Sequence, residues 1–195
     1  NVLLLHYSLA PENKFPAAIN EVSLFLNKIG SINTKIPKYE NLYLFGESSG
    51  GNLAVASILN SNVKNLEGLI LINSSLDYYG AHDSKIEFKS GYCLDDYVRK
   101  YFATHYINVE EDRKNPLVSP LLSDNLKLLP RSFIANSYFD PMRDEAFAFH
   151  NKLLDSKIDA ELHCYNTIHN FINMNIRPYS EQCLDRINNF INHTA

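Results

Sequence analysis

Short apolar runs alternate with helix-like patterns along the whole of this 195-residue sequence, and this alternation limits the folds open to it. The runs lack the polar alternation of half-exposed strands, and they span Val2–His6, Leu42–Phe45, Leu69–Ile72, Ser132–Ala135 and Ala160–Tyr165. Parallel strands that are buried on both faces read as continuous apolar runs. The sequence therefore predicts an α/β fold, with a mostly parallel sheet and helices on both of its faces.

The intervals between the runs carry helical spacing. Apolar residues recur every three or four positions after Pro16, along Asn52–Leu59, along Asp95–Tyr106, from Met142 to Leu153, and after Pro178. Residues 77–129 are less regular. We expect a single domain over residues 1–195, with 77–129 as an irregular, helical insertion between strands.

Composition excludes several classes of protein. The net charge of −4 argues against a nucleic-acid partner or an anionic membrane surface, because both require a basic face. No apolar run approaches the ~18–20 residues that span a bilayer. The three cysteines, Cys93, Cys164 and Cys183, are odd in number and widely spaced, which predicts free thiols and a cytoplasmic location. Nothing in the sequence specifies an oligomeric state.

In a parallel α/β sheet, ligands bind beyond the carboxyl ends of the strands, so the polar residues that follow each strand matter most. Gly46-Glu47-Ser48-Ser49-Gly50-Gly51 lies between an expected strand and an expected helix. That is the setting of a nucleophile elbow, in which small residues around Ser48 permit a sharp turn. Gly46, Glu47, Gly50 and Gly51 would form the elbow. The alternative is a plain turn between a strand and a helix.

Two more polar residues follow later strands. Asp140 precedes Pro141, where it could equally cap a helix, and His169 follows the last run, where a lone histidine is usually not catalytic. Together with Ser48 they occur in the chain order Ser, Asp, His, which is typical of α/β-hydrolases. In such a triad the histidine removes the serine proton, and the aspartate fixes the histidine tautomer and stabilises its cation.

The sequence resembles the hormone-sensitive lipase family of α/β-hydrolases, which are carboxylesterases and lipases. The matching segments are Tyr7–Glu12, Phe15–Ala18, Gly46–Ala54, Asp140–Glu145 and His169–Phe171. The resemblance implies that Ser48 is the nucleophile, His169 the base and Asp140 the acid, and that the Ser49 N–H is one donor of the oxyanion hole. It implies a small-molecule ester as the substrate and no cofactor.

Some features depart from the family pattern. His6-Tyr7-Ser8 stands where Asp-Tyr-Arg is usual, and the His-Gly-Gly-Gly oxyanion loop is absent from this sequence. Loss of one oxyanion donor typically lowers turnover by ~10²–10³-fold. Because the sequence starts at Asn1 inside an apolar run, we expect an N-terminal truncation that removes that loop, the first strands and the cap.

Two alternatives follow. One is a catalytically impaired fragment, or a pseudoenzyme that serves in binding. The other is an amidase or peptidase that uses the same triad.

Other patterns favour no additional function. His163 and Cys164 are adjacent strand residues that point to opposite faces, so we expect no metal site. Asn73-Ser74-Ser75 and Asn192-His193-Thr194 match the N-glycosylation pattern, a match that we expect to be coincidental.

Overall fold

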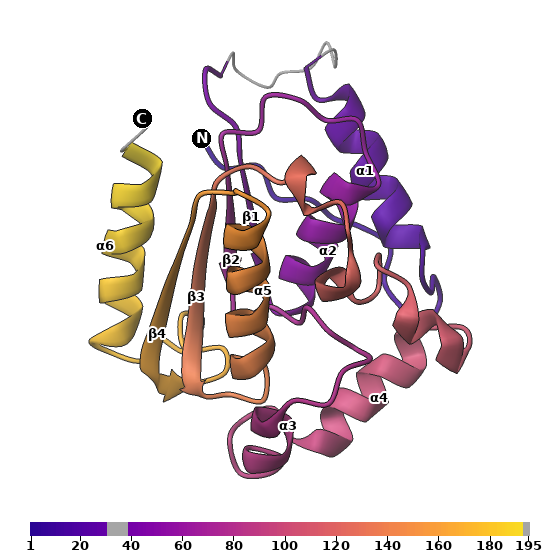
Figure 1. Ribbon diagram of the computed structural model, residues 1–195, viewed down its shortest axis with the longest axis vertical. Helices are drawn as coiled ribbons and strands as arrows, with labels where there is room; N and C mark the ends of the chain where they lie inside the picture. Colours follow the sequence, from indigo (N-terminus) through magenta and orange to yellow (C-terminus); the bar gives the residue numbers. More distant parts are fainter. Residues whose placement is uncertain (31–38, 193–195) are drawn as a thin grey trace.

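The computed structural model describes residues 1–30 and 39–192, and its centre is a four-stranded parallel sheet (Figure 1). The strands are β1 (Tyr43–Glu47), β2 (Gly68–Ile72), β3 (Ser132–Phe139) and β4 (Ala160–Ile168), in the spatial order β1-β2-β3-β4. Each pair of neighbours is parallel. The parallel α/β sheet expected from the last four apolar runs is therefore confirmed.

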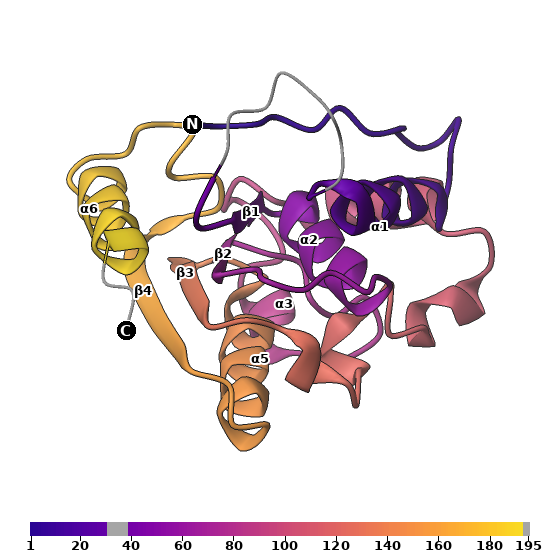
Figure 2. The same cartoon turned by 90° about the horizontal axis from the view of Figure 1, so that it is seen from above.

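Helices cover both faces of the sheet, as Figures 1 and 2 show. Helices α1 (Ala17–Lys28), α2 (Ser49–Leu59) and α5 (Arg143–Asp155) lie on one face, and α6 (Tyr179–Asn192) lies on the other. Alternate residues of β2 enter the two cores. Leu69 and Leu71 pack in the core with α1, α2 and α5, whereas Ile70 and Ile72 pack in the core with α6. Burial on both faces explains why β2 is apolar at every position after Gly68.

Residues 77–129 contain helices but no strand. Helix α3 spans Asp83–Glu87 and α4 spans Asp96–Tyr106, which confirms the expected helix over 95–106. Three short 3₁₀ helices follow at Glu110–Lys114, Pro120–Leu122 and Leu126–Leu128. In Figure 1, α3 and α4 lie beyond the carboxyl ends of β3 and β4.

The first apolar run does not form the buried strand that we expected. Residues 1–9 belong to no helix or strand, and Val2 is 98% exposed. Leu5 and Tyr7 are partly buried against the core that contains α1 and α2. The prediction is wrong because apolar composition sets only a preference for burial. A strand also needs a neighbour for its N–H and C=O groups, and none of β1–β4 pairs with this segment.

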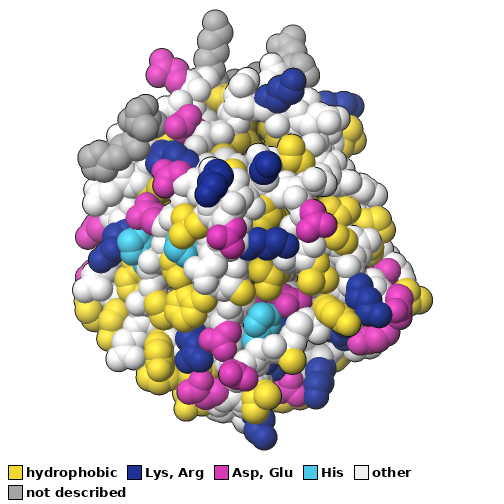
Figure 3. Space-filling model, viewed as in Figure 1, with side chains coloured by type: hydrophobic (Ala, Val, Ile, Leu, Met, Phe, Trp, Pro, Cys, Tyr) yellow, Lys and Arg dark blue, Asp and Glu magenta, His cyan; other side chains and the backbone are white. Residues whose placement is uncertain are grey.

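On the face shown in Figure 3, acidic and basic side chains are interspersed among hydrophobic ones. None of the helices in residues 1–30 and 39–192 combines the length and the apolarity needed to cross a bilayer.

Candidate active site

Ser48 occupies a strained turn between β1 and α2. Its φ of 53° and ψ of −118° place a non-glycine residue in a conformation that costs about 1–3 kcal/mol and is concentrated at functional sites. Its N–H donates to the carbonyl of Ile72, and its own carbonyl accepts from the N–H of Ser75. These bonds to the end of β2 and the loop after it hold the turn in place.

Close packing explains two of the expected elbow glycines. A Cβ on Gly46 would lie 2.3 Å from the carbonyl oxygen of Gly50, and one on Gly51 would lie 1.8 Å from Ser74 Oγ. Both distances are too short for a side chain. Gly50 differs, because a Cβ there would meet nothing within 4 Å. The close approach at the elbow therefore needs glycine at 46 and 51, whereas space does not require it at 50.

The structure brings Ser48, Asp140 and His169 together from three different strands. Ser48 Oγ lies 3.1 Å from His169 Nε2, and His169 Nδ1 lies 2.8 Å from Asp140 Oδ2. Asp140 is fully buried and His169 is 6% exposed, whereas Ser48 is half-buried. An ionised Asp140 can only accept, so Nδ1 carries the hydrogen and Nε2 is left to accept from the serine hydroxyl.

Asp140 is not the N-cap of α5, because that position is Met142, but each oxygen of Asp140 has its own partner. Oδ1 accepts from the N–H of Met142 at 2.8 Å, in the turn that leads into α5. Oδ2 faces His169. The bond from Met142 therefore fixes the carboxylate within this turn and leaves its second oxygen directed at the imidazole.

Glu47 connects the elbow to the loop that carries His169. Its Oε2 accepts from Asn173 Nδ2 at 2.6 Å, and the same amide donates to Asn170 Oδ1 at 2.7 Å. Burial raises the pKa of Glu47, although the bond from Asn173 and the nearby His169 oppose this shift. The hydrogen bond between Glu47 and Asn173 ties the segment after β4 to the end of β1.

Ser49 is the first residue of α2 and is exposed. The first N–H groups of a helix have no acceptor within the helix, and the helix dipole favours negative charge at this end. The position suits an oxyanion donor beside Ser48.

The sequence analysis missed one buried contact of the acid. Asn73 directly follows β2, is fully buried, and donates from Nδ2 to Asp140 Oδ2 at 2.5 Å. The sequence does contain a signal for Asn73, because it directly follows an expected strand. The same criterion identified Ser48, Asp140 and His169. Asn73 also begins one of the two glycosylation patterns that we expect to be coincidental. In the second such pattern, His193 and Thr194 lie outside the described residues.

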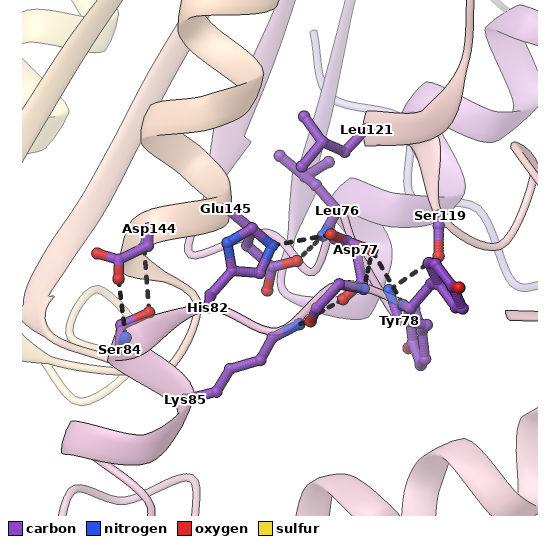
Figure 4. Close-up of polar contacts among 12 residues, drawn as sticks. Leu76, Asp77, Tyr78, His82, Ser84, Lys85, Ser119, Leu121, Asp144 and Glu145 are labelled. Atoms are coloured by element: carbon purple, nitrogen blue, oxygen red, sulfur yellow. Dashed lines mark hydrogen bonds and ion pairs between the residues drawn. The ribbon is translucent and has the colours of Figure 1, made fainter. Parts of the chain in front are cut away.

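A second polar cluster, shown in Figure 4, lies between the loop after β2 and the start of α5. Asp77 Oδ2 pairs with His82 Nε2 at 2.8 Å, and Asp77 Oδ1 accepts from the N–H groups of Tyr79 and Gly80. Burial alone would raise the pKa of Asp77. The His82 ring, the two N–H groups and Lys85 outweigh burial and hold this pKa below its usual value.

The same view shows how residues 77–129 are attached to α5. The N–H of Ser84 donates to Asp144 Oδ2 at 2.8 Å, and the N–H of Asp144 donates to Ser84 Oγ at 3.2 Å. Close by, the buried Glu145 accepts from the N–H of Leu76 at 3.0 Å. Asp144 and Glu145 lie in the same short segment as Asp140, so the attachment is made close to Asp140.

Histidine 163 has partners other than a metal. Its Nε2 lies 2.7 Å from Glu161, and its Nδ1 lies 2.7 Å from Arg186 on α6. Within the described residues, no three His, Cys, Asp or Glu side chains come together in a way that could hold a metal ion.

Comparison with known proteins agrees with this geometry. A family model described as the α/β-hydrolase fold matches residues 1–173, and the chain belongs to that family. The family expected from the sequence is thereby confirmed.

Similar proteins are named as esterases. An arylesterase of Saccharolobus solfataricus is 31% identical over 164 residues, which are 80% of this chain and 53% of that protein. An acetyl esterase of Salmonella choleraesuis is 29% identical over 181 residues, or 88% of this chain and 55% of that protein. A solved fungal esterase from Rhizomucor miehei superposes with a TM-score of 0.88 at 27% identity, covering 97% of this chain and 62% of that one. The chain thus spans about half the length of the curated relatives it matches.

Proposed function

We propose that this chain carries the catalytic triad of a serine esterase, with Ser48 as nucleophile, His169 as base and Asp140 as acid. One observation carries the proposal: a continuous line of hydrogen-bond distances runs from Ser48 Oγ through His169 to the fully buried Asp140. The strained backbone of Ser48 supports it, since a plain turn has no need of a costly φ and ψ at a serine.

The reaction follows from these positions. Ser48 Oγ attacks the ester carbonyl carbon while its proton passes to His169 Nε2, and the N–H of Ser49 stabilises the oxyanion. Cleavage of the C–O bond releases the alcohol, which takes the proton from His169 and leaves an acyl group on Ser48. Water then attacks the acyl carbon and gives a proton to His169. The acid departs as Ser48 regains that proton.

We propose small carboxylic esters as the substrates. This rests on the relatives named arylesterase and acetyl esterase and on the absence of a nucleic-acid or membrane signal in the composition. p-Nitrophenyl acetate is both an aryl and an acetyl ester, so it suits both names. p-Nitroacetanilide has the same acyl group on nitrogen, so comparing the two separates an esterase from an amidase.

A fluorophosphonate probe tests the nucleophile directly. We expect covalent labelling of Ser48 in this chain, located by peptide mass spectrometry, and no labelling of Ser48→Ala. Ser61→Ala is a matched control, because Ser61 follows the far end of α2 and its hydroxyl donates to Ile58. Labelling of another serine, or none in a folded chain, would refute the proposal and favour the impaired or binding homologue.

We also propose that residues 1–195 form one domain with 77–129 as an insertion. The bonds between Ser84 and Asp144 support this. Circular dichroism and tyrosine fluorescence should then report one coincident unfolding transition, and two separate transitions would contradict it.

The three free cysteines, Cys93, Cys164 and Cys183, support a cytoplasmic location, which fractionation of cells that express the protein would check.

A further inference from the structure

Asn73 lies between the nucleophile and the acid at the carboxyl end of the sheet. It directly follows β2, whose neighbours are β1, which leads to Ser48, and β3, which leads to Asp140. Its N–H donates to the carbonyl of Ala135 on β3 at 2.9 Å. The backbone therefore fixes Asn73 beside the segment that carries the acid.

The side-chain amide of Asn73 is directed at the carboxylate of Asp140. Nδ2 lies 2.5 Å from Asp140 Oδ2, 3.0 Å from Ser137 Oγ and 3.4 Å from Asn136 Oδ1. The contact with Asp140 is the shortest of the three. The oxygen that receives it is the one that also faces His169 Nδ1.

Asn73 is costly to the fold in two ways. Its φ of 43° is a left-handed conformation, and its side-chain Oδ1 is buried without a hydrogen-bond partner among the described residues. An orphaned buried carbonyl and a positive φ both reduce stability, and such costs are concentrated at functional sites. Packing alone does not account for an amide at this position.

The orientation of the amide depends on the charge of Asp140. If the amide were turned over, its Oδ1 would face Asp140 Oδ2, and an ionised carboxylate has no hydrogen to donate. With Nδ2 inward, the carboxylate has three donors: Met142 N–H on Oδ1, and Asn73 Nδ2 and His169 Nδ1 on Oδ2. Buried polar groups need hydrogen-bond partners, and these three donors fix both oxygens of the carboxylate in place.

We propose that Asn73 is a positioning residue for the acid of the triad: its amide donates to Oδ2 of Asp140 and keeps that oxygen directed at His169. The inference rests on the proposed function, because it concerns the same triad. The side-chain amide of Asn73 bonds to Asp140, Ser137 and Asn136, so it acts on the triad through Asp140.

Two variants of Asn73 test the proposal. Asn73→Gly removes the amide and accepts the positive φ without strain. Asn73→Asp keeps the shape but places a second carboxylate against Asp140. We expect kcat for p-nitrophenyl acetate to fall about ten- to hundredfold in both, the range for losing a hydrogen bond to a charged group, with KM unchanged.

The matched control is Asn52→Ala. Asn52 is also a buried asparagine, but its amide donates to the carbonyls of Ser75 and Val118 and not to the triad. Its loss should lower the melting temperature without a selective fall in kcat. Equal loss of kcat in Asn52→Ala and in the Asn73 variants would reduce Asn73 to a structural residue and overturn the proposal.

Nuclear magnetic resonance separates this proposal from the proposed function, because it needs no turnover. In the unsubstituted chain we expect a low-field resonance from His169 Nδ1–H and a slowly exchanging, downfield Asn73 amide proton. The His169 resonance should weaken or move in Asn73→Gly and persist in Asn52→Ala.

The possible outcomes are distinct. If the chain is inactive but gives the expected resonances of His169 and Asn73, the proposed esterase function is refuted and the proposed role of Asn73 stands. An Asn73 amide proton at an ordinary shift that exchanges rapidly overturns that role, even where the variants fail to fold.

Discussion

The stability of the Glu145→Gln variant, relative to that of the unsubstituted chain, should rise between pH 5 and pH 8. Glu145 lies on α5, is fully buried, and accepts from the N–H of Leu76 through Oε2, while its Oε1 has no partner among the described residues (Figure 4). Burial raises the pKa of Glu145 to about 7, although Lys85 and His82 lie close enough to oppose the shift. The protein therefore holds this side chain neutral over much of the acid range.

The raised pKa costs stability as the pH increases. Below the ordinary value of 4.5, Glu145 is protonated in both the folded and unfolded states and has no effect. Between 4.5 and about 7 the unfolded chain ionises while the folded one does not, so the free energy of unfolding falls. At about 1.4 kcal/mol for each pH unit, the loss approaches about 3 kcal/mol above pH 7.

Glutamine mimics the protonated form and does not titrate, so the variant escapes this loss. The free energy of unfolding of Glu145→Gln, minus that of the unsubstituted chain, should rise by about 2–3 kcal/mol between pH 5 and pH 8. Urea titrations followed by circular dichroism at several pH values measure this difference. The glutamine amide can also change the free energy of unfolding by an amount that does not depend on pH. That amount cancels, because only the change of the difference with pH is compared.

The neighbouring Asp144 provides the control. Burial would raise its pKa, but Arg143 and Ser84 outweigh burial and hold the pKa below its usual value. Asp144 is therefore ionised in both states above pH 5, and the effect of Asp144→Asn should be flat from pH 5 to 8. A flat or falling difference for Glu145→Gln would refute the reasoning, because Glu145 would then be ionised and held by Lys85 and His82.

Three further changes test the site and the core. Asp140→Asn should lower kcat about 10⁴-fold while circular dichroism stays unchanged, since the amide would favour the wrong histidine tautomer; near-normal turnover would contradict this role. Gly46→Ala should cost about 1–3 kcal/mol in urea unfolding, because its Cβ meets the Gly50 carbonyl, whereas Gly50→Ala meets open space and should cost less. Phe149→Ala should cost about 3–5 kcal/mol, since Phe149 is wholly buried on α5, and a smaller loss would show that the core there collapses around the gap.

Local patterns were sufficient to predict most of the sheet and the residues that the structure brings together at its edge, Ser48, Asp140 and His169. The runs at 69–72 and 132–135 are apolar because both sheet faces are buried, so their sequence alone marks them as strands. Ser48, Asp140 and His169 follow strands, and parallel strands bring such residues to one edge. Their order along the chain, Ser, Asp and then His, is typical of α/β-hydrolases and gave the remaining evidence for this group.

What the sequence could not supply depends on contacts between distant segments. Val2–His6 has the composition of a buried strand, but strand formation depends on a pairing partner that composition does not reveal. Asn73 belongs to an apparent glycosylation pattern, and only the packing of β2 against β3 places its amide on Asp140, 67 residues away. The neutral state of Glu145 likewise arises from burial by segments outside its own helix.

The spatial order of the strands also makes the geometry of the site depend on both edges of the sheet. Within the described sheet, Ser48 follows β1 and His169 follows β4, which are its two outermost strands, whereas Asp140 follows the inner strand β3. Outer strands have neighbours on one side only, and weakly held segments open before the whole molecule unfolds. Ser48 and His169 therefore remain within hydrogen-bond distance of one another only while β1 and β4 are both paired with their neighbouring strands. If the proposed function holds, labelling of Ser48 therefore requires all four strands of the described sheet to be in place.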